Sequence, residues 1–251
     1  MAKVRIETTD PGVRLLTLTD PGKRNALGEQ MSSELIAVLQ ALRADADTRA
    51  LVVTGEGDAF CAGADLPELF GDTDRCVIET HATLQAYYQA FLGVRELGFP
   101  TVAAVNGPAV GAGLNLALSC DLRIASPNAA FGATFARIGL HPGGGCTWFL
   151  VRAVGASRAL RTLLLGEEID AEQAVAWGLA DGPEADCVAA AIDLASRFAA
   201  LDPSLARHIK RTVGLAVSTN DLGAVLEYES WAQAASTSSP VFQAWVERFR
   251  R

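Results

Sequence analysis

The stretch that decides the fold is 104-AVNGPAVGAGLNLALSCDLRIAS-126. Short apolar runs at 101–107 and 121–126 predict buried strands, and the apolar segment between them predicts a helix. A strand–helix–strand order with all-apolar strands is typical of a parallel sheet with right-handed connections. The helix starts with the small residues Gly111, Ala112 and Gly113 and carries one amide, Asn115, among apolar neighbours.

The segments before this stretch extend the same architecture. Residues 3–9 and 13–19 alternate in polarity on either side of an Asp-Pro-Gly turn, which predicts a β-hairpin. Hydrophobic spacing predicts a helix at 29–45, a buried strand at 50–55 and a helix at 79–96. The fold class is therefore expected to be α/β.

The C-terminal part is expected to be helical. Strand signals nearly vanish from about Gly143 onward, and no low-complexity linker separates the two parts. Helices are predicted at 143–154, 156–165, 171–178, 185–200, 203–217, 221–235 and 240–250. The apolar residues near the end, among them Trp231 and Trp245, are too many for a free tail. They predict packing on the chain's own core or, as we favour, against another subunit.

Composition excludes several classes of function. The chain has 251 residues, half of them hydrophobic, and a formal net charge of -8 with a pI of about 4.9. Such a surface repels nucleic acid and anionic membranes. No apolar run approaches the ~18 residues of a membrane span. The five cysteines form no C-x-x-C pair, which argues against a disulfide framework or a zinc site and favours reduced thiols in the cytoplasm.

Several familiar catalytic motifs are missing from the sequence. It contains no G-x-G-x-x-G, no G-K-[ST] and no G-x-S-x-G. The three histidines, His81, His141 and His208, have no paired metal-ligand spacing, so no metal site is expected.

Two loops of small residues provide the strongest chemical signal. Both 61-CAGADL-66 and 110-VGAG-113 stand where a strand gives way to a helix. Such junctions free backbone N–H groups beside the positive end of a helix, and small side chains let a ligand oxygen approach them. Close strand–helix packing would explain one such loop. The two together favour an oxyanion hole, in which each donor contributes roughly 3–4 kcal/mol.

Five blocks of sequence, in order, resemble the enoyl-CoA hydratase/isomerase (crotonase) superfamily. They are 20-DPGKRNAL-27, 59-AFCAGADL-66, 104–126, 131–145 and 177-WGL-179. The resemblance extends from about residue 3 to the end. It implies a spiral core of ββα units over residues 1–195 and a helical trimerisation region over 196–251. It also implies a homotrimer or a dimer of trimers.

The same resemblance implies an acyl-coenzyme A ligand. The thioester oxygen is expected between the backbone N–H groups of Ala64 and Ala112. Residues expected to contact the rest of the ligand are Ala26, Leu27, Ala62, Gly63, Asp65, Leu66 and Gly111, with Lys23 or Arg24 facing the phosphates. Alternatively, Lys23 and Arg24 belong to an ordinary solvated turn and bind no ligand. No permanently bound cofactor is expected, because coenzyme A arrives as part of the substrate.

The chain departs from the hydratases at both positions where the resemblance places a catalytic glutamate. These positions hold Asn115 and Phe135, neither of which transfers a proton near neutral pH. His141 is a candidate replacement, although a surface loop histidine explains it as well. Glu68 and Asp72 are expected to be solvated, and Cys61 and Cys146 to be buried.

Three hypotheses remain open from the sequence. The chain is an acyl-CoA enzyme with altered chemistry, such as isomerisation, decarboxylation, retro-Claisen cleavage or thioester hydrolysis. Alternatively, it retains weak hydratase activity with water held by Asn115. In the third hypothesis, the chain binds an acyl-CoA without catalysing a reaction.

Overall fold

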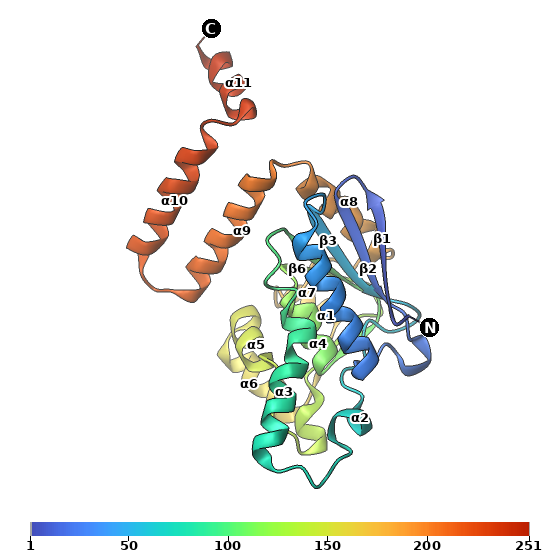
Figure 1. Cartoon of the computed structure of the whole chain (residues 1–251). Helices are drawn as coiled ribbons and strands as arrows, with labels where there is room; N and C mark the ends of the chain where they lie inside the picture. Colours follow the sequence, from blue (N-terminus) through green and yellow to red (C-terminus); the bar gives the residue numbers. More distant parts are fainter. Residues whose placement is uncertain (1, 251) are drawn as a thin grey trace. The chain divides into compact units, whose positions relative to one another are not determined.

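The computed structural model describes residues 2–250, which form two compact units (Figure 1). The first unit ends at Ala199 and the second begins at Ala200. The boundary expected at residue 195 falls inside helix α8 (Cys187–Ala199). This helix belongs to the first unit because Ala195 and Ala199 are buried against its strands.

Eight strands of the first unit form two sheets. Their bounds are β1 Val4–Asp10, β2 Val13–Leu18, β3 Ala50–Gly55, β4 Thr101–Val105, β5 Pro108–Val110, β6 Leu122–Ala125, β7 Ala130–Gly132 and β8 Glu168–Asp170. The larger sheet has the order β1-β2-β3-β4-β6. Its β1 and β2 pair antiparallel and the others parallel, so the predicted hairpin and parallel sheet are confirmed.

Helices connect and cover these strands. The bounds in the first unit are α1 Glu29–Ala44, α2 Leu66–Phe70, α3 Val77–Leu92, α4 Ala112–Ser119, α5 Cys146–Val154, α6 Ala156–Leu165, α7 Ala171–Ala176 and α8, with 3-10 helices η1 Pro21–Lys23 and η2 Thr134–Ile138. Those of the second unit are α9 Pro203–Ser218, α10 Leu222–Ser236 and α11 Pro240–Phe249.

The central strands β3 and β4 of the larger sheet are buried on both faces, as their all-apolar sequences predict. Successive residues of a strand point to opposite faces. Leu51 and Val53 therefore join one core cluster with residues of α1, α3 and α4. Ala50 and Val52 join another cluster, in which α8 covers the second face of the sheet.

The smaller sheet was not predicted. It has the order β5-β7-β8, and β8 lies between the helices predicted at 156–165 and 171–178, where no strand was expected. Each of these strands has only three residues, too few to show an alternating pattern. The sheet matters for the pocket described below because the Gly111 N–H donates to the Gly132 carbonyl at 2.9 Å, which fixes the chain just before α4.

The second unit carries an apolar surface on its helices. Leu222, Trp231 and Phe249 expose 70%, 70% and 83% of their surface. Within the unit, His208 Nδ1 lies 2.6 Å from the Tyr228 hydroxyl. No helix within residues 2–250 combines the length and the apolar composition needed to cross a bilayer.

Candidate active site

The two loops of small residues lie against each other at the N-terminus of α4. The Val110 N–H donates to the Cys61 carbonyl at 2.9 Å. A Cβ on Gly63 would lie 2.6 Å from the Val110 oxygen, and one on Gly113 would lie 2.1 Å from the Cys61 oxygen. Glycine is therefore required at both positions for the two backbones to approach this closely.

Ala64 and Ala112 line the same pocket. Ala112 is the first residue of α4, where N–H groups have no acceptor within the helix. Among the hydrogen bonds of residues 2–250, none uses the N–H of Ala64 or of Ala112 as donor. A Cβ on Gly63, the residue before Ala64, would lie 3.5 Å from the Ala112 nitrogen. Two available donors thus come from adjoining loops.

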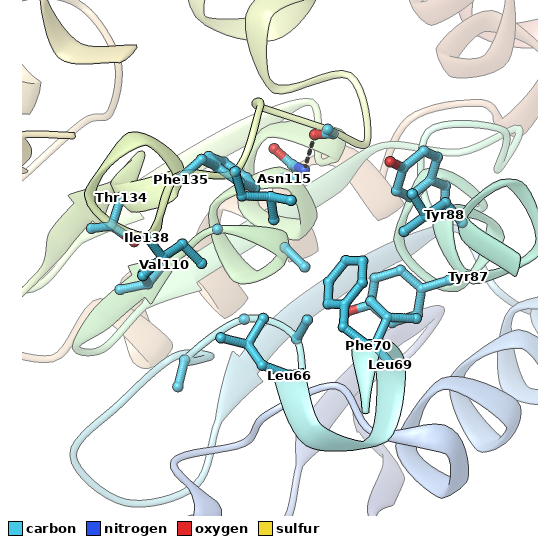
Figure 2. A pocket seen from close by; sticks show the side chains of 18 of the residues that line it. Leu66, Leu69, Phe70, Tyr87, Tyr88, Val110, Asn115, Thr134, Phe135 and Ile138 are labelled. Carbon is cyan, nitrogen blue, oxygen red and sulfur yellow. Dashed lines mark hydrogen bonds between the residues drawn. The ribbon is translucent and has the colours of Figure 1, made fainter. Parts of the chain in front are cut away.

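These residues line a pocket that encloses about 710 Å³ of empty space, open solvent included (Figure 2). Its aromatic walls are Phe70, Tyr87, Tyr88, Phe91 and Phe135. Aliphatic walls come from Leu66, Leu69, Leu84, Val110, Ile138 and Leu140. Of the described residues that line it, none is an aspartate, glutamate, lysine or arginine. The pocket is therefore an apolar space with backbone donors and few polar side chains.

Asn115 lies in this pocket, about one helical turn after Ala112. It is only 1% exposed, and its Nδ2 donates to the Gly143 carbonyl at 2.9 Å (Figure 2). Its Oδ1 is buried without a hydrogen-bond partner in the structure. A carboxylate at this position would face the Gly143 oxygen without a proton to share. The amide therefore makes a hydrogen bond that an ionised carboxylate in its place could not make.

Phe135 forms part of the apolar wall. It belongs to η2, and its ring lies 3.8 Å from where a Cβ of Gly111 would be. The side chain packs beside the start of α4 and has no group that could transfer a proton.

His141 lies at the exposed edge of the pocket. Its Nδ1 is 2.8 Å from the carbonyl oxygen of Pro142. That acceptor requires the proton to be on Nδ1 whenever the ring carries only one, which leaves Nε2 as the acceptor. Of the sequence-predicted site residues, Ala62, Gly63, Ala64, Leu66, Gly111, Ala112, Asn115, Phe135 and His141 line the pocket.

The remaining predicted ligand contacts lie beside the pocket lining. The Leu27 N–H donates to the Gly63 carbonyl at 2.7 Å, and the Asp65 N–H donates to the Leu27 carbonyl at 3.3 Å. The segment that contains Ala26 and Leu27 therefore runs along the first loop.

Lys23 and Arg24 precede that segment and differ in their surroundings. Lys23 Nζ binds Asp65 at 2.6 Å and Glu68 at 3.2 Å. The hydrogen bonds to Asp65 and then Glu68 raise the pKa of Lys23. The hydrogen bond from Lys23 lowers the pKa of Asp65. Arg24 is less engaged, with its guanidinium 3.9 Å from Asp58.

Two carboxylates near the first loop, Glu68 in α2 and Asp72 after it, make contacts outside the pocket lining. Glu68 also accepts from the Glu29 N–H at 2.8 Å, at the start of α1. Asp72 pairs with Arg75 at 3.2 Å. Neither lines the pocket, so neither replaces the missing glutamates.

The cysteines near the loops are buried thiols. Burial raises the pKa of Cys61 to about 12 and that of Cys146 to about 12. Both are therefore protonated at neutral pH and are poor nucleophiles.

The thiols should differ sharply in reactivity. Cys76 is exposed, whereas the other four cysteines are buried. An aromatic disulfide reagent at pH 8 is expected to modify one thiol per native chain quickly, and all five only after denaturation. Absorbance of the released thiolate measures the count. The Cys76→Ser variant should show no fast phase, and a fast phase in that variant would contradict the assignment.

Sequence reasoning missed Tyr87 as a pocket residue. Its side chain reaches the pocket from α3, and its hydroxyl is buried without a hydrogen-bond partner in the structure. Burial raises the pKa of this phenol, which is therefore neutral and able to donate. A tyrosine within an apolar helix gives no pattern that distinguishes it from core packing.

Comparison with known proteins identifies the family. A family model described as enoyl-CoA hydratase/isomerase matches residues 8–250. The chain belongs to this family. It is 45% identical over 247 residues to a probable enoyl-CoA hydratase of Mycobacterium tuberculosis, covering 94% of this chain and 93% of that protein.

Solved structures of the enoyl-CoA hydratase/isomerase family share the fold. A putative family member from Mycobacterium abscessus superposes with a TM-score of 0.90 at 35% identity, covering 98% of this chain and 95% of that one. A putative enoyl-CoA hydratase from Thermobifida fusca, solved in complex with CoA, gives 0.84 at 33% identity, with 94% and 93% covered. The expected crotonase-like α/β fold is confirmed.

Proposed function

We propose that this chain binds an acyl-coenzyme A thioester and activates its carbonyl group. The thioester oxygen accepts hydrogen bonds from the N–H groups of Ala64 and Ala112. The observation that carries this proposal is that both N–H groups lack an acceptor among the described residues and belong to residues that line one apolar pocket. The CoA complex of the Thermobifida fusca relative supports the choice of ligand.

The surroundings of these donors strengthen their effect. Ala112 stands at the N-terminus of α4, where the helix dipole adds positive potential. The apolar walls lower the local dielectric, which increases the interaction with a developing oxyanion. Each fixed donor of this kind contributes roughly 3–4 kcal/mol to stabilising the transition state.

The pocket favours chemistry that runs through an enolate or oxyanion without paired carboxylates. Hydration of an enoyl thioester by two glutamates needs two carboxylates, and the described lining residues include no aspartate or glutamate. A proton would instead move through His141 Nε2, a water held by Asn115, or the substrate's own groups. Lyase or isomerase chemistry of this kind is our first candidate. The absence of a carboxylate from the described lining also favours a second candidate, a non-catalytic acyl-CoA binder.

The coenzyme part of the ligand extends past Ala26 and Leu27, beside the first loop. Arg24 is the more available partner for the phosphates of the ligand. Its side chain is 59% exposed, and its single carboxylate partner among residues 2–250, Asp58, lies at the long distance of 3.9 Å. Lys23 would have to exchange Asp65 and Glu68 for a phosphate. The chain needs no resident cofactor in this proposal and acts in the cytoplasm.

Calorimetric titration with acyl- and enoyl-CoAs, with crotonyl-CoA absorbance followed on the same sample, tests the proposal. Saturable binding is expected, with little or no hydration of crotonyl-CoA. Absence of binding to every thioester would refute the acyl-CoA proposal. Turnover that His141→Ala abolishes, with binding retained, would assign the proton transfer to His141, and unchanged turnover would exclude it.

The second unit is proposed to assemble the chain into a homotrimer or a dimer of trimers. Trp231 and Trp245 expose 70% and 53% of their surface among further exposed apolar residues of the same helices, and large exposed apolar patches mark interaction sites. Light scattering after size exclusion is expected to give three or six times the chain mass of 26.4 kDa. A monomer at micromolar concentration would contradict the assembly.

A further inference from the structure

The short helix α2 forms part of the pocket wall without being buried itself. Leu66, Leu69 and Phe70 line the pocket from this helix (Figure 2). None of the five residues of α2 is buried, and Leu66 exposes 42% of its surface. Most helices in proteins are held in place by burial of an apolar face. The position of α2 must therefore depend on polar contacts with neighbouring segments.

Glu68 makes such contacts from within α2, where it is the charged residue in the sequence Leu-Pro-Glu-Leu-Phe. Its Oε2 accepts from the Glu29 N–H at 2.8 Å, and its Oε1 accepts from Lys23 Nζ at 3.2 Å. Glu29 is the first residue of α1, and Lys23 is the last residue of η1. One carboxylate thus joins α2 to two other elements of the first unit.

The start of α1 is open to this carboxylate because its N-cap residue is Gly28. Glycine has no side chain that could cap the helix, and the first N–H groups of a helix have no acceptor within it. A Cβ on Gly28 would lie 2.3 Å from Glu68 Oε2. The carboxylate therefore occupies the space that a side chain at residue 28 would need. A negative charge is also favoured at this end of a helix, where the dipole is positive.

The chain before α2 is held independently of Glu68. The Asp65 N–H donates to the Leu27 carbonyl at 3.3 Å, and Asp65 Oδ2 binds Lys23 Nζ at 2.6 Å. Loss of the Glu68 carboxylate is therefore expected to free the body of α2. The first loop, which carries the Ala64 N–H, should keep its position.

We propose that Glu68 is a positioning residue, which acts through α2 and makes the pocket selective for the acyl part of its ligand. With Glu68 bound to the start of α1, the apolar residues of α2 stay against the acyl group, and each methylene group that they cover adds to the affinity. Without this anchor α2 moves away, and the acyl group loses one wall of the pocket. This inference rests on the proposed acyl-CoA function.

Calorimetric titration of wild type and Glu68→Ala with coenzyme A, butyryl-CoA and octanoyl-CoA tests the role in acyl selection. The acyl preference is the dissociation constant of coenzyme A divided by that of the tighter-binding thioester. Glu68→Ala should lower this ratio by about fivefold or more, while the affinity for coenzyme A itself stays within about twofold of wild type. Glu68→Gln keeps an oxygen that can accept from the Glu29 N–H, so it should restore the ratio to within about twofold of wild type.

Gly28→Ala tests the same contact from the opposite side. Its methyl group would need the space that Glu68 Oε2 occupies, and a flexible carboxylate can leave that space at little cost. The φ angle of Gly28 is −84°, which alanine adopts without strain. This variant should therefore reproduce the loss seen in Glu68→Ala. Asp72→Ala is the matched control, because it removes a neighbouring carboxylate that pairs with Arg75, and it should keep the wild-type ratio.

Hydrogen–deuterium exchange without ligand separates this inference from the function on which it rests. Exchange in segment 66–71 should quicken by about fivefold or more in Glu68→Ala and Gly28→Ala, and remain unchanged in Asp72→Ala. Unchanged exchange in both variants, or an unaltered acyl preference, would overturn the inference even if thioesters bind.

Two further outcomes would also count against the role in acyl selection. Equal losses of affinity for coenzyme A and for the thioesters would attribute the effect to general destabilisation and overturn that role. If exchange quickens but no thioester binds wild type, the proposed function and the acyl selection both fail, and only the anchoring of α2 by Glu68 stands. Thermal melts check that each variant remains folded.

Discussion

Replacing Gly113 by alanine is expected to destabilise the first unit by about 3 kcal/mol or more. The added Cβ would lie 2.1 Å from the Cys61 carbonyl oxygen and 2.7 Å from the Cys61 Cβ. Both atoms belong to the adjoining loop, whose backbone is held by the Val110–Cys61 hydrogen bond. The loops must therefore separate to accept the methyl group. Urea denaturation should show the loss, and the thermal midpoint should fall by about 6–12 °C.

Gly22→Ala is the matched control for this substitution. Gly22 also belongs to the first unit, and a Cβ there would have no atom within 4 Å. This variant is expected to unfold within about 0.5 kcal/mol of wild type. If Gly113→Ala proved equally stable, the close approach of the two loops would be incorrect.

Replacing Ala112 by proline is expected to remove one donor while preserving the helix. Proline lacks the N–H but suits the first position of a helix, which Ala112 occupies in α4. The preceding residue is Gly111, which has no Cβ to clash with the proline ring. Affinity for the acyl-CoA should fall at least fivefold, and any turnover should fall roughly 100-fold or more. Calorimetry and steady-state assays measure the two effects.

Ala112→Gly provides the comparison for the proline variant. It keeps the N–H and removes only the methyl group, so binding should stay within about twofold of wild type. Equal binding and turnover by the proline variant and wild type would show that the Ala112 N–H does not contact the ligand. A loss of equal size in the glycine variant would attribute the effect to packing.

The local sequence pattern was sufficient for the hairpin, the parallel sheet and the two loops. Each has a strong periodic or small-residue signal, and 50–55 matches β3 to the residue. The smaller sheet was missed because in β8 a single buried residue, Ile169, stands between two exposed ones. Three residues are not enough to distinguish a strand from a turn.

The surroundings of the site residues depend on contacts that no local pattern contains. Asn115 meets the Gly143 carbonyl 28 positions later in the chain. Lys23 meets Asp65 across 42 positions, so its pairing could not be read from its own turn. Sequence could place Asn115 in the pocket, but only the fold shows which of its two polar atoms is free.

The thioester carbonyl stretch in the infrared tests the central claim most directly. Binding of an acyl-CoA labelled with carbon-13 at this carbonyl should shift the stretch to lower frequency, because two N–H donors weaken the C=O bond. The shift should be at least halved in Ala112→Pro and retained in Ala112→Gly. A thioester that binds wild type with its carbonyl at the solution frequency would contradict the proposed contact with Ala64 and Ala112.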